Sequence, residues 1–234
     1  MVVALLLLAG GLLWEPAFYG SRTGGRWGVG VASGTDEAGA DVERLAGRMM
    51  TKAASLHAAM RQDGAWEALI AEREINAWLA HDLPRNHAAL LPSGVSDPRV
   101  CLQQRRAQVG ARVGYGWLSA VVWCEVGVQL RGVNQIVIVV NQAGLGGIPL
   151  PRAACAKRLA DRLAKWGLPG EMRPIDGRMG VVIYTDRQPE RAGAGWQLSA
   201  LQLEAGEAML AGTARKESAG VSMSAGDGLP TPRE

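Results

Sequence analysis

The residues whose types could support catalysis are few in this chain, and their spacing does not assemble a known catalytic set. The three histidines, His57, His81 and His87, show no spacing typical of metal ligands. Glu72 and Glu74 stand two positions apart in a predicted helix, where side chains at that spacing diverge. The chain also lacks the Gly-x-Ser-x-Gly motif of serine hydrolases. The sequence therefore predicts no catalytic residues and no metal site.

A glycine-rich segment is the one candidate for a cofactor site. Residues 141–147 (Asn-Gln-Ala-Gly-Leu-Gly-Gly) connect a predicted strand to a predicted helix, a layout in which free backbone N–H groups can bind phosphate. The segment resembles the pyrophosphate loop of the acetyl-coenzyme A-dependent N-acyltransferases, and this resemblance assigns Gly144, Gly146 and Gly147 to coenzyme A. It differs from that loop in its first residue, Asn141, and in two following prolines, which have no amide hydrogen. An ordinary tight connection is the alternative interpretation.

Composition places the chain among ordinary globular proteins of one domain. It has 234 residues, of which 48% are hydrophobic and 20% charged. A formal net charge of +3, without a clustered basic face, predicts no nucleic-acid partner. Cys101, Cys124 and Cys155 are an odd number without a C-x-x-C pair, so we expect buried free thiols. A bond between Cys101 and Cys124 in an oxidising compartment is the alternative.

The N-terminal segment suggests a membrane attachment. Residues 1–14 carry no charged side chain, but they are fewer than the roughly 20 apolar residues that cross a bilayer. Their length matches the apolar region of a signal peptide, or of an anchor that starts further upstream. We therefore divide the chain into an anchor or signal segment (1–19), a Gly-rich linker (20–35), one domain (36–214) and a disordered tail (215–234). This division predicts a membrane-anchored protein on the extracytoplasmic side, the alternative being a buried strand or helix of a soluble protein.

Hydrophobic periodicity predicts an α+β fold. Residues 36–62 place apolar side chains three and four positions apart, as in an amphipathic helix. Residues 117–131 alternate apolar and polar side chains, as in a strand with one buried face. Further strands are predicted at 66–70, 99–104, 106–114, 134–141, 181–185, 196–203 and 207–213, helices at 72–82 and 152–166, and loops at 86–98 and 144–151. Together they predict a curved antiparallel sheet packed by two or three helices.

Parts of the chain resemble the YpmS-type membrane-anchored proteins, a family of unknown function. The resemblance lies in the helix start Ala71–Leu79 (Ala-Glu-Arg-Glu-Ile-Asn-Ala-Trp-Leu) and in the step Gly147–Pro151 (Gly-Ile-Pro-Leu-Pro). The closing hairpin 198–207 resembles the end of related lipid-binding-like domains. Those domains are similar to tubular lipid-binding folds, in which a long helix lies in a strongly curved sheet beside an apolar groove. The resemblance implies this fold, and an N-terminal anchor, for a chain whose element order agrees over roughly residues 65–213.

The residues themselves are compatible with such a groove. Glycines inside or beside the predicted strands would let the sheet curl, and the helices at 37–62 and 152–166 would cover its apolar face. Met49, Met50 and Met60 would form a compliant wall; the alternative is that they fill a dry core. The sequence thus predicts a membrane-tethered, non-enzymatic domain that binds lipid or another apolar ligand, or acts as an envelope interaction partner. A coenzyme A-dependent N-acyltransferase is the alternative function.

Overall fold

The computed structural model describes residues 16–20, 36–115, 118–165, 167–168, 170–185 and 195–215. Most of the predicted anchor and linker, and the predicted tail beyond residue 215, lie outside these residues. Trp117, which begins a predicted strand, and Trp166, which ends a predicted helix, also lie outside them. No helix in the described part of the chain is long and apolar enough to span a bilayer.

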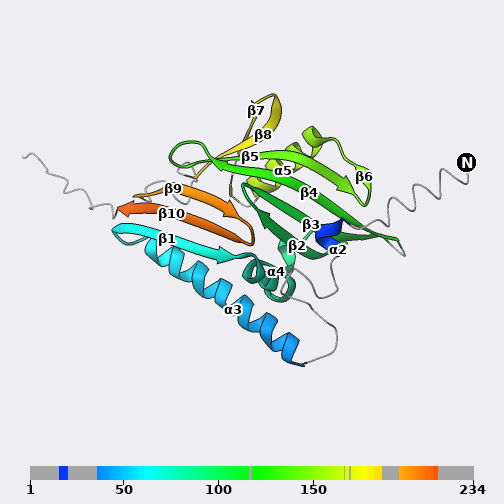
Figure 1. The fold of residues 1–234 in the computed structure, drawn as a ribbon, viewed down its shortest axis with the longest axis horizontal. Helices are drawn as coiled ribbons and strands as arrows, with labels where there is room; N and C mark the ends of the chain where they lie inside the picture. The colour runs from blue at the N-terminus through cyan, green and yellow to red at the C-terminus, as the bar shows by residue number, and fades with distance from the viewer. Residues whose placement is uncertain are drawn as a thin grey trace, which may run out of the picture.

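In the described residues, two antiparallel sheets and three main helices form the fold, which confirms the predicted α+β class (Figure 1). The small sheet has the order β1-β10-β9, with strands β1 (Gly64–Ala71), β10 (Glu207–Arg215) and β9 (Gly195–Glu204). The large sheet has the order β2-β3-β4-β5-β8-β7, and the short strand β6 pairs with β5. Its strands are β2 (Val95–Gln103), β3 (Arg106–Tyr115), β4 (Leu118–Leu130), β5 (Gln135–Leu145), β6 (Ile148–Pro149), β7 (Gly170–Ile175) and β8 (Arg178–Tyr184).

The helices lie against different parts of these sheets. Helix α3 (Asp36–Ala59) lies along β1 and contacts α4 (Glu72–Asn86), which packs on β2. Helix α5 (Arg152–Lys165) packs on β5, β7 and β8. A single helical turn, α2 (Ala17–Gly20), precedes them, and a short 3-10 helix (Ala88–Leu90) follows α4.

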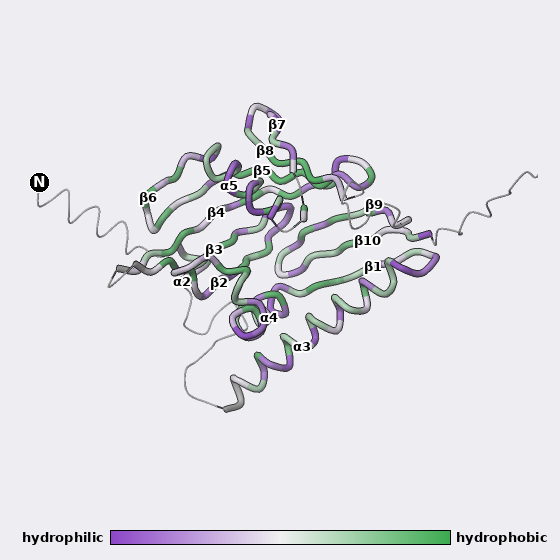
Figure 2. The backbone as a smooth tube through the Cα atoms, turned by 180° about the vertical axis from the view of Figure 1, so that it is seen from behind, coloured by the Kyte–Doolittle hydropathy of each residue, from purple (hydrophilic) through white to green (hydrophobic). Residues whose placement is uncertain are grey.

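The large sheet buries one of its faces. Its inner face carries Val126 and Val140, which pack in one cluster with Ala156 of α5 and Leu203 of the small sheet. Figure 2 shows hydrophobic residues concentrated in β5 and β8, whereas α3 alternates between hydrophobic and hydrophilic residues. Because side chains alternate across a strand, the neighbours of Val126 and Val140 point to the opposite face, which we call the outer face. Polar side chains gather on this outer face.

Helix α3, which was predicted to wall an apolar groove, packs directly on its neighbours. Val42, Leu45 and Ala46 form a buried cluster with Ala77 of α4, and Trp78 packs against it. The end of the helix packs on a tryptophan pair of the small sheet.

The three methionines predicted to wall the groove lie in different surroundings. Met60 packs on the cluster of Trp66 and Trp196, whose ring centres are 6.3 Å apart in an edge-to-face arrangement. Met50 is 49% exposed, and Met49 is partly buried. They therefore do not form one wall.

Helix α4 continues through Pro84 to Asn86, beyond the predicted end at residue 82. A proline removes one N–H donor and crowds the carbonyl four residues earlier, but the residues after it can still bond to the preceding turn. Here the N–H of His87 donates to the carbonyl of Leu83 at 3.0 Å. One helical turn beyond a proline is therefore stable, and the predicted boundary was too early.

Strands occupy part of both predicted loops, residues 95–98 of the first and 144–145 and 148–149 of the second. Strand β2 begins at Val95, before the proline that ends the predicted loop. Its pairing with β3 is irregular between Ser96 and Arg99, and such an irregularity accommodates a proline, which cannot donate a ladder hydrogen bond. Strand β5 continues to Leu145 and turns back into β6, so the segment predicted as a loop at 144–151 is largely a hairpin at the edge of the large sheet. Strand β7 was not predicted, because four of its six residues are exposed and show no alternation.

Candidate functional site

An open cleft of about 580 Å³ crosses the outer face of the large sheet. Arg105 of the β2–β3 turn and Arg106 at the start of β3 bound one side. Asp176 of the β7–β8 turn and Arg178 at the start of β8 bound the other. Gly127 of β4 lies in the floor between Arg106 on β3 and Val139 on β5. Because glycine has no side chain, the sheet backbone itself is accessible at this point.

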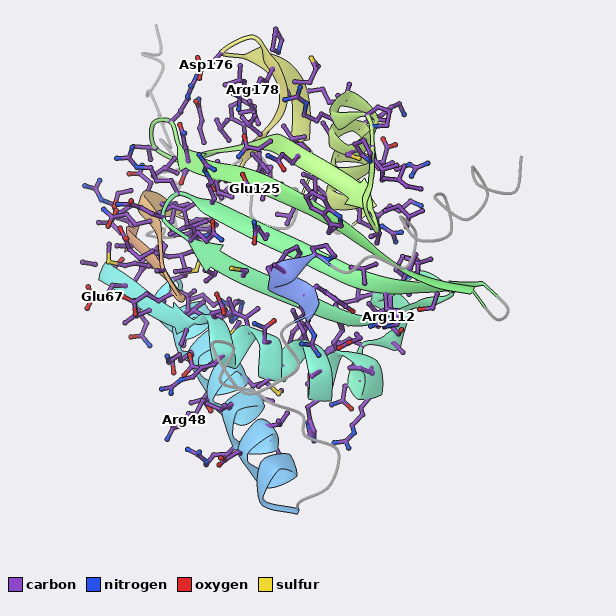
Figure 3. All side chains as sticks on the ribbon, turned by 45° about the vertical axis from the view of Figure 1, so that its right-hand side comes forward. Arg48, Glu67, Arg112, Glu125, Asp176 and Arg178 are labelled. Atoms are coloured by element: carbon purple, nitrogen blue, oxygen red, sulfur yellow. The ribbon has the colours of Figure 1, made fainter. Side chains whose placement is uncertain are left out.

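A hydrogen-bonded network organises the polar side of the cleft (Figure 3). Glu125 of β4 is only 8% exposed. It accepts hydrogen bonds from Arg106 Nη1 at 3.3 Å, from Gln108 Nε2 at 3.2 Å and from Asn141 Nδ2 at 3.3 Å. Asn141 in turn accepts a bond from Arg178 Nη1 at 3.1 Å. The buried carboxylate therefore holds one arginine directly and a second one through an amide.

A register shift brings Asn141 into this network. The pairing of β4 with β5 is irregular between Glu125 and Val126, where Gln142 and Val140 are the partners and Asn141 has none. Such a bulge re-aims a side chain without ending the strand. The side chain of Asn141 consequently hydrogen-bonds to Glu125 on the neighbouring strand β4 and to Arg178 on the neighbouring strand β8.

The lining of the cleft is cationic. Of the described residues in this lining, Asp176 is the one carboxylate, and it forms an ion pair at 2.6 Å with Arg131, which does not line the cleft. Within the residues that the structure describes, the guanidinium of Arg105 makes no hydrogen bond or ion pair, while its backbone N–H donates to the Leu203 carbonyl at 2.9 Å. Arginine presents several donors in a planar fork that fits carboxylate and phosphate groups. The arrangement can therefore bind an anion.

A second open cleft, of about 540 Å³, adjoins the first. The two share Gln104, Arg105 and Gln129 in their lining. The second cleft follows the seam between the end of β4 and strand β9. Arg105 thus stands where both clefts meet.

The glycines assigned to coenzyme A support the packing of a tryptophan in this structure. A Cβ atom at Gly144 would lie 2.7–2.9 Å from the ring of Trp123. The indole Nε1 of Trp123 donates to the Gly146 carbonyl at 2.8 Å, and the N–H of Gly146 donates to the Val121 carbonyl at 2.6 Å. Gly146 and Gly147 form the β5–β6 turn. A coenzyme A site here stays a prediction, against which the occupied N–H of Gly146 counts.

Replacing Gly144 by alanine should lower the free energy of unfolding by about 1–3 kcal/mol, because the added methyl overpacks the site of the Trp123 ring. Urea unfolding followed by tryptophan fluorescence measures the change. Gly47→Ala is the matched control, since a Cβ at this helical glycine meets nothing within 4 Å. Equal stability of the two variants would contradict the placement of Trp123.

The structure does not bring the three histidines together. His57 lies exposed on α3, His81 contacts Arg85, and His87 faces Asp82 at 3.4 Å. Among the described residues no group of three or more metal-binding side chains gathers.

The two glutamates of the α4 start have separate structural partners. Glu72 accepts the N–H of Leu102 at 2.6 Å; burial raises its pKa, and this hydrogen bond opposes the rise. Glu74 accepts bonds from Lys52 at 2.7 Å and from the Ala71 N–H at 3.0 Å. Burial raises the pKa of Glu74, but these bonds and the charge of Lys52 outweigh it, so the net pKa is lowered. The two carboxylates do not form an acid–base pair.

All three cysteines are free thiols. Cys101 pairs with Gln108 on β3, and Gln108 pairs with Glu125 on β4, so these residues share the outer face. Cys124 precedes Glu125 and therefore points to the inner face. The alternative bond between Cys101 and Cys124 is incompatible with this geometry. Burial raises the pKa of the Cys124 thiol to about 11, which makes it a weak nucleophile.

Sequence reasoning missed the cleft. It recognised the polar face of the strand at 117–131, but the two arginine-bearing turns meet there only because β2–β3 and β8–β7 flank β4 and β5 in the sheet order.

No protein-family model, curated protein or solved structure matches this chain.

Proposed function

We propose that this chain is a membrane-tethered, non-enzymatic domain that binds an anionic, lipid-like ligand in the outer-face cleft, on the extracytoplasmic side. The observation that carries the proposal is the cleft with Arg105, Arg106 and Arg178 in its lining. A membrane tether is supported by the uncharged residues 1–14 of the sequence.

The cleft suits a ligand with both a charged and an apolar part. Beside Arg178, which pairs with Ile175, the lining includes a small apolar wall of Val139 with the largely buried Val137 and Ile175. Binding sites of this kind combine apolar surface with a few polar groups that fix orientation. A headgroup would bind the guanidinium groups while an adjoining chain contacts this wall.

Binding rather than catalysis is supported by the state of the carboxylates. A general base must be able to take a proton from the ligand. Glu125 already accepts three hydrogen bonds, and Asp176 is paired with Arg131. Glu125 holds Arg106 of the cleft lining, whereas Asp176 holds Arg131 outside it.

Native mass spectrometry of the full chain in detergent, with added phosphatidylglycerol or phosphatidylcholine, tests the proposal. We expect phosphatidylglycerol to bind, and Arg178→Gln to weaken it tenfold or more, which is about 1.4 kcal/mol. Arg48→Gln, on the exposed side of α3, is the matched control and should leave binding unchanged. Lipid binding that neither variant alters, or no binding, would contradict the proposal. Micromolar binding of acetyl-coenzyme A that Gly146→Val weakens would favour the N-acyltransferase instead.

A further inference from the structure

We infer that the outer face of the large sheet docks on the bilayer that holds the N-terminal segment, and that the cleft binds phosphate-bearing headgroups of anionic lipids in that same bilayer. This inference rests on the proposed tether and on the proposed anion-binding cleft. It adds the orientation of the domain and the source of the ligand.

Helix α2, which follows the apolar segment in the sequence, lies on this face. Helix α2 follows shortly after residues 1–14, and its Tyr19 is 2% exposed. Phe18 and Tyr19 lie over Gly110 of β3, where a Cβ would be 3.0–3.1 Å from their rings. Gly110 and Gln108 are two apart on β3, so they share the outer face with Glu125.

The cleft lies close to this point. Gly110 and Arg106 are four residues apart on β3, which is about 13 Å along a strand. Figure 3 shows Glu125 and Arg178 on the side of the large sheet that also carries α2. The inner face is occupied by α5 and the small sheet. Of the two faces of the large sheet, the outer one therefore lies nearer to the bilayer.

The charge of this face complements an anionic membrane. Two arginines, Arg99 and Arg112, flank Tyr19, with guanidinium carbons 5.4 and 5.7 Å from its ring centre. Three more arginines line the cleft. An arginine near an anionic surface contributes favourably to membrane association, and the contribution decays within a Debye length. Arg99 is ion-paired with Asp97 at 3.2 Å and Arg106 with Glu125 at 3.3 Å, so the charge that favours approach to anionic headgroups comes chiefly from the other arginines of this face.

Hydrogen exchange of the full chain in nanodiscs tests the docking. In discs containing phosphatidylglycerol, exchange in the β2–β3 turn (104–105) and the β7–β8 turn (176–177) should be about tenfold slower than in pure phosphatidylcholine discs, a change that one or two arginine–headgroup contacts would give. The double variant R105Q/R178Q should lose this protection. Arg48→Gln should retain it.

A further arm separates the two possible sources of phosphate. Soluble glycerol phosphate is added to the protein in phosphatidylcholine discs. If it protects both turns while phosphatidylglycerol discs do not, the cleft binds a free phosphate compound and bilayer docking is wrong; the proposed function then stands only if phosphatidylglycerol still binds to the protein in detergent. If neither protects the turns, both proposals are wrong. Protection by anionic discs that Arg48→Gln abolishes as strongly as R105Q/R178Q would place the contact on α3 and overturn the docking.

Discussion

Replacing Tyr19 by alanine is expected to lower the free energy of unfolding by about 3–5 kcal/mol, the cost of deleting a large buried aromatic side chain. The ring packs on Gly110 and between two arginines, and its hydroxyl donates to the Asp97 carbonyl at 2.7 Å. Tyr19 lies before the predicted domain boundary at residue 36, yet it is part of the core. Urea unfolding of the full chain in detergent measures the loss. Wild-type stability of the variant would show that α2 does not dock on β3.

Tyr19→Phe separates the hydroxyl from the ring and should cost only about 0.5–1.5 kcal/mol at neutral pH. Burial, and next the negative charge of Asp97, hold the pKa of Tyr19 well above its usual value, while Arg112 and Arg99 oppose them. In the unfolded chain the phenol ionises near its ordinary pKa of about 10. The contribution of the neutral Tyr19 hydroxyl to the free energy of unfolding should therefore be fully present below about pH 10. It should fall as the pH rises towards the pKa of the folded state. The phenylalanine variant should lack this component of the fall, and an identical pH profile would contradict the buried hydroxyl.

The position of Tyr19 decides which N-terminal truncation keeps its packing contact with the large sheet. Removal of residues 1–14 keeps the contact with Gly110, whereas removal of residues 1–20 deletes it. The sequence predicted a linker beginning at residue 20 and an anchor before it. A single buried tyrosine in an otherwise irregular stretch gives no periodic signal, so its packing could not be predicted.

The regular elements could be predicted because their periodicity directly reflects burial. Helix α3 and strand β4 have long amphipathic patterns, and both were located within a few residues. The role of the segment at 141–147 could not be decided from the sequence, because glycine supports a phosphate loop and a close side-chain approach equally well. Its role depends on Trp123, eighteen or more positions earlier in the chain, whose ring lies on Gly144.

The helix start at 71–79 was recognised as a motif, but its role appears only in three dimensions. Asn76 donates to the Val100 carbonyl and accepts the Val100 N–H, both at 2.8 Å. Glu72 accepts the N–H of Leu102, the next residue of β2 that points the same way. β2 is the edge strand of the large sheet, and an edge strand leaves backbone groups unpaired. The motif therefore completes the hydrogen bonding of this edge.

Asn134 serves the edge of the small sheet in the same manner, and its replacement by alanine should cost about 2–4 kcal/mol. Its N–H donates to the Leu198 carbonyl at 3.1 Å, and its Oδ1 accepts the Leu198 N–H at 2.7 Å. Alanine would leave that buried N–H without an acceptor, at about 1–3 kcal/mol. Asn134 also has a φ of +62°, a left-handed conformation that costs alanine about 1 kcal/mol or more. Urea unfolding again provides the measurement.

Glycine substitutions at the two asparagines distinguish these contributions. At position 134 glycine relieves the left-handed backbone, so Asn134→Gly should be more stable than Asn134→Ala, with the loss of the acceptor common to both. At position 76 the backbone is helical, so the order should reverse, and Asn76→Gly should be about 1 kcal/mol less stable than Asn76→Ala. The same order at both positions would contradict the left-handed conformation of Asn134. The reversed order would show that the asparagine at the edge of the large sheet is held on a helical backbone and the one at the edge of the small sheet on a left-handed turn.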